Sequence, residues 1–203
     1  RPLGVDESVF NASVRPANSR EREFTVLSTR SFLPLYRVED ILRAAALLRE
    51  KLPGLCVILA GDGPERERLA ALGVELGLGD KLRFTGQLKP AELASRLASC
   101  GAYVSTSPAD GTSVSLLEAL ALGCLPVVTD IPANRAWVRH GENGLLFPPG
   151  DIGSLAACLE RAVADSALTA RAKTGGPRLV AENGLWSGHI ALVDSLYREL
   201  CGE

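Results

Sequence analysis

The chain has 203 residues, of which 46% are hydrophobic and 23% charged, a composition typical of a globular protein with one substantial core. The net charge is −2 and no stretch gathers lysines and arginines, which argues against a nucleic-acid partner. The longest apolar runs are too short to cross a bilayer, and the first ten residues lack the apolar segment of a signal peptide.

Short apolar runs alternate with helical patterns from residue 24 onward. Strands are predicted at residues 24–29, 55–60, 81–85, 102–106, 125–129 and 144–147. Helices are predicted between them at residues 38–51, 64–77, 90–99, 114–122 and 132–139. Strands that are apolar throughout and separated by helices favour a parallel sheet covered on both faces. The predicted fold class is therefore α/β, with a doubly wound, Rossmann-like parallel sheet of about six strands.

The pattern changes after residue 150, where only helices are predicted. Asp151 is a suitable N-cap for a helix over residues 152–165. A second helix is expected over residues 167–184, broken at Gly175-Gly176-Pro177. A final amphipathic helix over residues 186–201 carries one apolar stripe, formed by Ile190, Val193, Leu196, Tyr197 and Leu200. Residues 1–20 are predicted to be a linker or leading arm, and residues 21–203 the domain itself.

Ligands bind open α/β sheets at the carboxyl ends of the strands. That edge should collect the loops at residues 28–36, 61–63, 86–89, 105–115 and 130–134. Arg30 ends the first strand and would suit a phosphate ligand, although an ordinary surface arginine fits equally well. The Gly61-Asp62-Gly63 turn lacks the Gly-x-Gly-x-x-Gly fingerprint, so we interpret it as a structural strand-to-helix turn.

Two interpretations fit the stretch "ADGTSVSLLEALALGC" (residues 109–124). Ser115 and Glu118 have the spacing of a capping box, in which Glu118 would only satisfy a backbone N–H. Alternatively, the free N–H groups of residues 112–115 at a helix N-terminus would bind a diphosphate. Glu118 would then hold ribose hydroxyls, and Asp110 a sugar hydroxyl or a developing positive charge. The residues alone leave both interpretations open.

Cysteine and histidine placement predicts neither a disulfide framework nor a metal site. The five cysteines are widely spread, without a Cys-x-x-Cys pair, and the two histidines are far apart. Small buried thiols in a reducing cytosol explain the cysteines best, so a cytoplasmic protein is expected. No cofactor is expected, and no transmembrane segment; peripheral attachment of a longer protein to a membrane remains compatible with the sequence.

The order of motifs resembles a known family. The stretches "LCVILAGDGPERERL" and "RFTGQLKPAELASRLASCGAYVSTSPADGTSVSLLEALALGCLPVVTDIPANRAWVRHGENGLLFPPGD" resemble the C-terminal domain of family 4 retaining glycosyltransferases with the GT-B fold. The similarity runs from about residue 24 to residue 165. "RPLGVDESVF" is similar to the segment that enters this domain, and the final helix resembles the one that crosses back to the partner domain. The resemblance implies the donor-binding half of a two-domain enzyme whose N-terminal domain is missing.

The resemblance also assigns roles to individual residues. Asp110 and Glu118 match the acids of the family's Glu-x7-Glu motif, which implies that Asp110 lies beside the transferred sugar and Glu118 binds the donor ribose. Arg30 matches the phosphate-binding arginine and is assigned, with Asp110, to catalysis. The remaining implied donor contacts are the backbone N–H groups of Thr112, Ser113 and Val114, and the base-holding loop at Gln87 and Leu88.

Two departures from the family pattern stand out. The first acid is Asp110, one methylene shorter than the usual glutamate. Tyr36 stands where the family has a lysine, and the neighbouring Arg37 is expected to compensate as a donor-binding cation.

The resulting prediction is a metal-independent retaining transferase that moves a sugar from a nucleotide-diphosphate donor. The acceptor, a glycan or a lipid-linked sugar, would be bound through the N-terminal domain, so the isolated chain should be inactive. One alternative is a degenerate GT-B domain that binds nucleotides without catalysis. Another is a GT-B sugar-nucleotide epimerase, and a dinucleotide dehydrogenase is a third, less favoured because the glycine fingerprint is missing.

Overall fold

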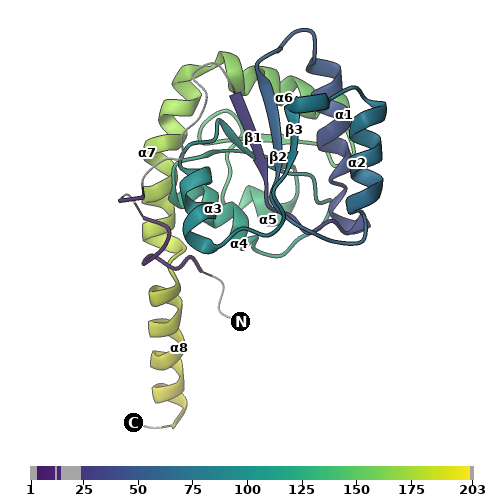
Figure 1. Ribbon diagram of the computed structural model, residues 1–203. Helices are drawn as coiled ribbons and strands as arrows, with labels where there is room; N and C mark the ends of the chain where they lie inside the picture. Colours follow the sequence, from purple (N-terminus) through teal and green to yellow (C-terminus); the bar gives the residue numbers. More distant parts are fainter. Residues whose placement is uncertain (1–3, 12, 15–23, 202–203) are drawn as a thin grey trace.

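The protein, described by a computed structural model, is built around a six-stranded parallel sheet (Figure 1). The description covers residues 4–11, 13–14 and 24–201, apart from the side chains of residues 189, 191, 192 and 196. The strands are β1 (Phe24–Ser28), β2 (Leu55–Leu59), β3 (Leu82–Phe84), β4 (Ala102–Ser105), β5 (Leu125–Thr129) and β6 (Leu145–Phe147). Their order is β3-β2-β1-β4-β5-β6, and every pair is parallel. The predicted doubly wound α/β fold is confirmed.

Helices cover both faces of the sheet. They are α1 (Glu39–Leu48), α2 (Arg66–Glu75), α3 (Pro90–Leu97), α4 (Val114–Ala121), α5 (Pro132–Arg135), α6 (Ile152–Ala164), α7 (Ser166–Asn183) and α8 (Trp186–Cys201), with short 3₁₀ turns at Pro34–Tyr36 and Gly79–Lys81. Asp151 caps α6, as predicted, by accepting a hydrogen bond from the Ser154 N–H at 2.9 Å.

Alternating strand residues pack into two separate hydrophobic cores, one on each face of the sheet, because successive side chains on a strand point to opposite faces. Val26, Val57 and Val104 lie in the core beneath α1, α2 and α6. Their neighbours Leu27 and Tyr103 lie in the second core, beneath α3 and α4. Strands buried on both faces explain the uninterrupted apolar runs in the sequence.

Helix α7 is continuous, so the predicted break at Gly175-Gly176-Pro177 is wrong. Tertiary packing keeps this segment helical. The backbones of α7 and α4 are in direct contact, since a Cβ on Gly176 would lie only 2.6 Å from the Leu120 carbonyl oxygen. Pro177 cannot donate to the carbonyl of Lys173 one turn earlier, and that carbonyl instead faces Gly123. Contact with α4 therefore offsets the helix-breaking tendency of this tripeptide.

The described part of the leading arm packs on the domain where α7 meets α8. Val5 is fully buried, its N–H donates to the Gly184 carbonyl at 2.8 Å, and its carbonyl accepts from the Trp186 N–H at 3.0 Å. Beyond this junction α8 projects away from the sheet (Figure 1). Of the predicted apolar stripe on α8, Ile190, Val193, Tyr197 and Leu200 are exposed, and the Leu196 side chain lies outside the described part. Within that part, no helix combines the length and apolarity needed to cross a membrane.

Candidate functional site at the carboxyl edge of the sheet

Arg30 follows β1 and meets the loop between β4 and α4. Its guanidinium forms an ion pair with Asp110, and its Nη1 donates to the Ser113 hydroxyl at 3.3 Å. The guanidinium carbon lies 4.6 Å from the centre of the Tyr36 ring, within the range of a cation–π contact. The Arg30 side chain is only 10% exposed. The structure therefore brings three predicted site residues, Arg30, Asp110 and Ser113, into direct contact.

Glycines in the loop after β2 hold the backbone at Arg30 in place. A Cβ on Gly61 would lie 2.4 Å from the Arg30 carbonyl oxygen. Gly63 has φ of 154°, and a Cβ there would lie 2.6 Å from the Phe32 carbonyl oxygen. The Phe32 N–H in turn donates to the Asp62 carbonyl at 2.9 Å. The Gly61-Asp62-Gly63 turn therefore packs backbone against backbone on the loop after β1, and this packing requires its glycines.

The N-terminus of α4 presents unpaired backbone donors. Ser113 is the N-cap, and its hydroxyl accepts a 3.4 Å hydrogen bond from the Leu116 N–H. The N–H groups of Thr112, Ser113, Val114 and Ser115 donate no hydrogen bond within the described part of the chain. Together with the helix dipole they favour an anion at this point.

The capping-box interpretation of Glu118 is wrong. The cap is Ser113, two residues before the predicted Ser115, so Leu116 occupies the capping-box position and Glu118 lies two residues beyond it. Its carboxylate has no hydrogen bond or ion-pair partner among the described residues, and burial raises its pKa to about 7. Glu118 lies one turn from Ser115 along the same helix, so the two side chains project from one face. A half-buried carboxylate without a partner is available to a ligand.

A cavity of about 260 Å³ opens beside the N-terminus of α4. It is lined by Thr29, Ser31, Ala60, Gly61, Asp62, Gln87, Leu88, Leu93 and Ser115. Gln87 and Leu88 follow β3, while the other polar lining residues follow β1 and β2 or begin α4. The cavity thus lies at the carboxyl edge of three neighbouring strands, where open α/β sheets bind ligands.

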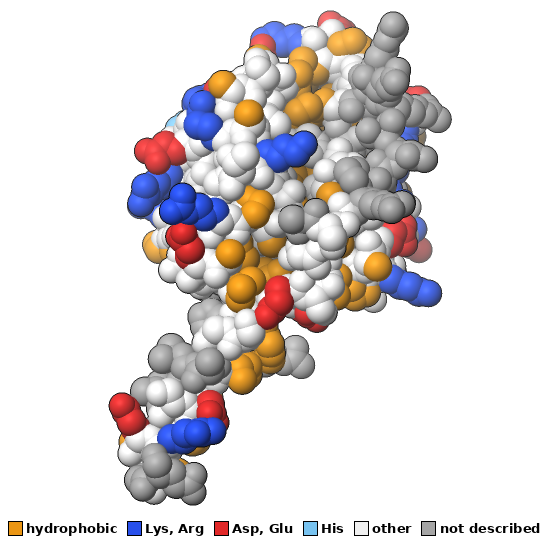
Figure 2. Space-filling view, turned by 90° about the vertical axis from the view of Figure 1, so that its left-hand side faces the viewer, with side chains coloured by type: hydrophobic (Ala, Val, Ile, Leu, Met, Phe, Trp, Pro, Cys, Tyr) orange, Lys and Arg blue, Asp and Glu red, His pale blue; other side chains and the backbone are white. Residues whose placement is uncertain are grey.

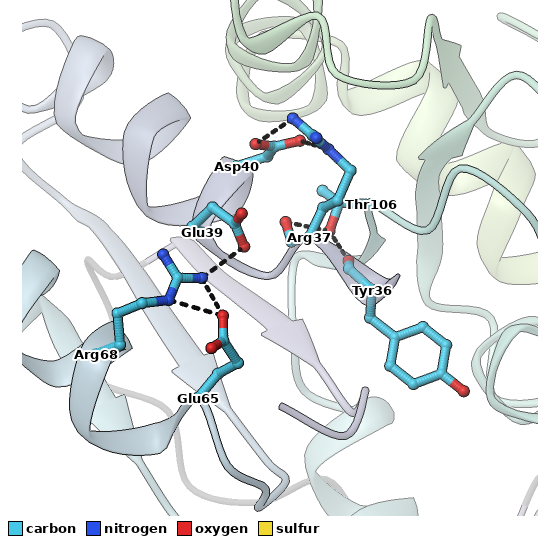
Figure 3. Close-up of polar contacts among 7 residues, drawn as sticks. All are labelled: Tyr36, Arg37, Glu39, Asp40, Glu65, Arg68 and Thr106. Carbon is cyan, nitrogen blue, oxygen red and sulfur yellow. Dashed lines mark hydrogen bonds and ion pairs between the residues drawn. The ribbon is translucent and has the colours of Figure 1, made fainter. Parts of the chain in front are cut away.

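Arg37 lies apart from this cluster. Its guanidinium binds the buried Asp40 carboxylate through Nε at 2.8 Å and Nη2 at 3.1 Å, whereas Tyr36 points the other way (Figure 3). Arg37 has φ of 49°, in the left-handed region, and is the one residue other than glycine with positive φ in the described part. The Thr106 hydroxyl, from the end of β4, donates to the carbonyls of Tyr36 and Arg37 and holds this turn in place.

Tyr36 is a residue whose contribution the sequence did not reveal. The family pattern marks it only as the place of a missing lysine, whereas in the structure its ring supports the Arg30 guanidinium. The sequence signal is weak, an aromatic residue six positions after the arginine. No group of three or more potential metal ligands occurs among the described residues.

Comparison with known proteins places this site in a family. The model of the family "Glycosyl transferases group 1" matches residues 10–178. The lipopolysaccharide core biosynthesis glycosyltransferase LpsE of Rhizobium meliloti is 35% identical over 134 residues, covering 65% of this chain and 38% of LpsE. The MMP α-(1→4)-mannosyltransferase of Mycolicibacterium hassiacum is 30% identical over 207 residues, covering 98% of this chain and 47% of the enzyme.

The fold agrees with these matches. Sucrose-phosphate synthase of Thermosynechococcus elongatus superposes with a TM-score of 0.88 at 26% identity, covering 98% of this chain and 52% of the synthase. The chain spans about half the length, or less, of the proteins it matches. Because the family model covers most of its residues and includes Arg30, Asp110 and Glu118, the chain belongs to the group 1 glycosyl transferases.

Proposed function

We propose that the chain is the donor-binding half of a retaining glycosyltransferase that uses a nucleotide-diphosphate sugar. The observation that carries this proposal is the convergence of Arg30, Asp110 and the α4 N-terminus beside the cavity. The diphosphate would bind Arg30 and the N–H groups of residues 112–115. The base would enter the cavity along Gln87 and Leu88, with the ribose hydroxyls on Glu118 and the sugar beside Asp110.

These groups would also assist the chemical step. As the bond between the sugar and the diphosphate oxygen breaks, negative charge develops on the leaving diphosphate. Arg30 and the α4 N–H groups would face that position before the ligand binds, and their fixed orientation would provide electrostatic preorganisation. These groups can carry the charge without a metal ion, and Asp110 would face the positive charge that develops on the sugar. With Arg37 bound to Asp40, Arg30 is the main side-chain cation at this point.

The acceptor would be held by a second, N-terminal domain. Helix α8 supports this proposal because Trp186, Ile190, Val193 and Tyr197 form an exposed apolar stripe on a helix that leaves the body. Figure 2 shows hydrophobic side chains where α8 departs. A partner domain lying against this stripe would close the cleft over the donor, in a protein we propose to be cytoplasmic. A glycan or a lipid-linked sugar would be the acceptor.

Titration of the chain with UDP and with GDP tests the proposal. We expect micromolar to millimolar binding of at least one, corresponding to roughly −4 to −8 kcal/mol. The affinity should be equal with and without EDTA, because no metal is needed. A transfer assay on the same sample should stay at background, since positioning of the acceptor supplies ~7–11 kcal/mol of the barrier reduction. Absence of binding, or dependence on a metal, would contradict the proposal, and robust transfer would place an acceptor site in this half.

Glu118→Gln should separate ligand binding from stability. The pKa of about 7 means that the free carboxyl is largely neutral at pH 6. Ribose hydroxyls stabilise the ionised form, so wild-type affinity should rise through pH 7 and then level off, by about tenfold in all. The variant should bind about tenfold more weakly at pH 8 with no such rise. Calorimetry between pH 5.5 and pH 8.5 measures both.

Thermal melts of the same variant give the complementary result. A pKa raised from its ordinary value of 4.5 contributes stability that is complete below pH 4.5 and lost as pH rises through 7. The wild type should therefore lose stability relative to Glu118→Gln between pH 5 and pH 8, while the two melt alike at pH 5. Unchanged nucleotide affinity in the variant would show that Glu118 has no ligand role.

Asp110→Asn should tighten binding of a nucleoside diphosphate by about two- to fivefold, equivalent to ~0.5–1 kcal/mol. In the free chain the Arg30 guanidinium is engaged by Asp110, and a phosphate must share or displace that partner. Asp130→Asn, which removes a partly exposed acid paired with Arg135 near the same edge, is the matched control and should not change affinity. Weaker binding by Asp110→Asn would mean that the Arg30–Asp110 pair forms part of the phosphate site as it stands.

A nucleotide-binding domain without transferase activity is the second candidate. It is favoured by Tyr36, which stands in the lysine position and supports Arg30 with a ring rather than with a second charge. An assay of donor hydrolysis and transfer by the full-length protein distinguishes the two. Donor turnover supports the transferase, whereas nucleotide binding without turnover supports the second candidate.

A further inference from the structure

Two cysteine thiols are in direct contact where the chain enters β4 and β5. The Sγ atoms of Cys100 and Cys124 lie 2.8 Å apart, and both cysteines are free thiols. Each stands shortly before its strand, and the first residues of the two strands, Ala102 and Leu125, are direct neighbours in the sheet. The pairing of β4 with β5 thus brings the thiols together at the amino edge of the sheet, opposite the candidate site.

The backbone beside each thiol is fixed by tertiary contacts of a glycine. Gly123, which follows α4, has φ of 70°, and a Cβ there would lie 2.7 Å from the Lys173 carbonyl oxygen. The Gly101 N–H donates to the Thr25 carbonyl at 2.9 Å, and a Cβ on Gly101 would lie 2.5 Å from the Phe24 ring. A disulfide brings its two sulfurs to about 2.05 Å, an approach of less than about 1 Å from the observed contact. Only a small movement of the two side chains therefore separates these thiols from a bond.

The two thiols differ in their access to solvent. Cys124 is 3% exposed, and burial, together with a hydrogen bond to Cys100, raises the pKa of its thiol well above the ordinary value. Cys100 is partly exposed, and its thiol donates to the Leu97 carbonyl at 3.4 Å. A small oxidant therefore reaches Cys100 first, with Cys124 behind it as a protonated thiol.

We propose that Cys100 and Cys124 form a peroxide-sensitive thiol pair, which closes into a stabilising disulfide when hydrogen peroxide oxidises Cys100. The Cys100 sulfur attacks one peroxide oxygen, the O–O bond breaks, and the departing hydroxide takes the thiol proton, which leaves Cys100 sulfenic acid and water. The Cys124 sulfur then attacks Cys100 Sγ, the S–O bond breaks, and the departing hydroxide takes the Cys124 proton to form a second water. Two electrons pass from the thiols to the peroxide. This reaction is independent of the proposed transferase function.

The disulfide would tie together the two ends of a segment that carries much of the candidate site. Residues 100–124 include Asp110, Ser113 and Glu118. A cross-link that closes a loop of this length restricts the unfolded chain and so stabilises the folded one. It would also protect Cys100, because a sulfenic acid without a partner thiol oxidises further to sulfinic acid, which is irreversible.

Mass spectrometry of the peroxide-treated chain tests the pair. Cys201→Ser serves as the parent chain, because Cys201 is exposed and can link two chains. Trypsin releases residues 97–135 as one peptide, since no lysine or arginine lies between Arg96 and Arg135. After treatment this peptide should be lighter by two hydrogens and should no longer react with iodoacetamide. A further cut after Glu118 should leave its two halves joined until they are reduced.

Single variants of this parent locate the reaction. In Cys124→Ser, Cys100 should gain two oxygen atoms as sulfinic acid, whereas in Cys100→Ser the Cys124 thiol should stay reduced. The oxidised parent should melt about 5–10 °C higher than the reduced one and return to its starting value with dithiothreitol. Neither variant should show this gain. Cys158→Ser is the matched control, because it removes a buried thiol that faces the Leu146 carbonyl, and it should respond as the parent does.

Three results would overturn the proposal. Alkylation of both cysteines in the treated parent, or a disulfide from either of them to Cys56 or Cys158, would show that they are not a redox pair. A disulfide between them without a higher melting temperature would overturn its stabilising role. Unchanged Cys100 in treated Cys124→Ser would show that Cys100 is not the thiol that meets the peroxide.

Discussion

Arg30→Ala is expected to weaken binding of a nucleoside diphosphate by about 30- to 150-fold, equivalent to ~2–3 kcal/mol for a lost charged hydrogen bond in a sheltered site. The guanidinium is 10% exposed, supported by the Tyr36 ring and bound to Ser113, so its orientation is fixed before the ligand arrives. No other described residue replaces it, because Arg37 is engaged with Asp40. Calorimetric titration of the variant measures the loss.

Two companion variants make this result specific. Arg30→Lys keeps the charge but loses the planar fork, and should recover only part of the affinity. Arg135→Ala removes an arginine that is 61% exposed and paired with Asp130, so it should bind like the wild type. If Arg30→Ala binds within threefold of the wild type, the diphosphate does not lie on Arg30 and the proposed donor geometry is wrong.

Arg37→Ala is expected to lower the free energy of unfolding by about 2–3 kcal/mol, a fall in melting temperature of roughly 4–12 °C. The Asp40 side chain is 3% exposed, and Arg37 is the partner that neutralises its carboxylate. Removing one member of such a pair leaves a buried charge, which costs ~3–5 kcal/mol when the pair is fully buried. Because the Arg37 side chain is 40% exposed, water weakens the pair and we expect a value at the lower end. Chemical denaturation measures the change.

The matched variants separate charge from backbone strain. Arg37→Ala/Asp40→Asn should recover at least 1 kcal/mol of the roughly 2–3 lost, because no charge remains buried. Arg37→Gly should be at least as stable as Arg37→Ala, since glycine adopts a positive φ without the ~1–2 kcal/mol cost of a Cβ. If the double variant is no more stable than Arg37→Ala, the buried carboxylate is not the cause of the loss.

Much of the fold could be predicted from the sequence, because its signals are local. The central strands are buried on both faces and therefore read as unbroken apolar runs. The cap at Asp151 depends on a hydrogen bond only three residues away. The continuity of α7 could not be predicted, because it depends on contact between Gly176 and Leu120, far apart in sequence. At this point tertiary packing outweighs the low helix propensity of Gly175-Gly176-Pro177.

The same contrast between local signals and long-range contacts applies to the candidate site. The loop positions of Arg30, Asp110 and Ser113 followed from the rule that ligands bind at the carboxyl ends of strands, and their contact appears only in the structure. The cap of α4 was misassigned because Ser113 and Ser115 are equally good cap residues in sequence. The contact between Tyr36 and Arg30 could not be predicted, because the fold alone brings the ring under the guanidinium.

The central position of β1 in the strand order has a consequence for synthesis of the chain. One edge of β1 pairs with β2, but its other edge pairs with β4, where Val26 lies opposite Ala102. While the ribosome makes the first half, β1, β2 and β3 can assemble with α1 and α2, leaving the second edge of β1 open. An open edge on an apolar strand invites pairing with other chains. A nascent chain is therefore most prone to aggregation in the interval before Ala102–Ser105 emerges, and a truncation between β3 and β4 should aggregate rather than fold.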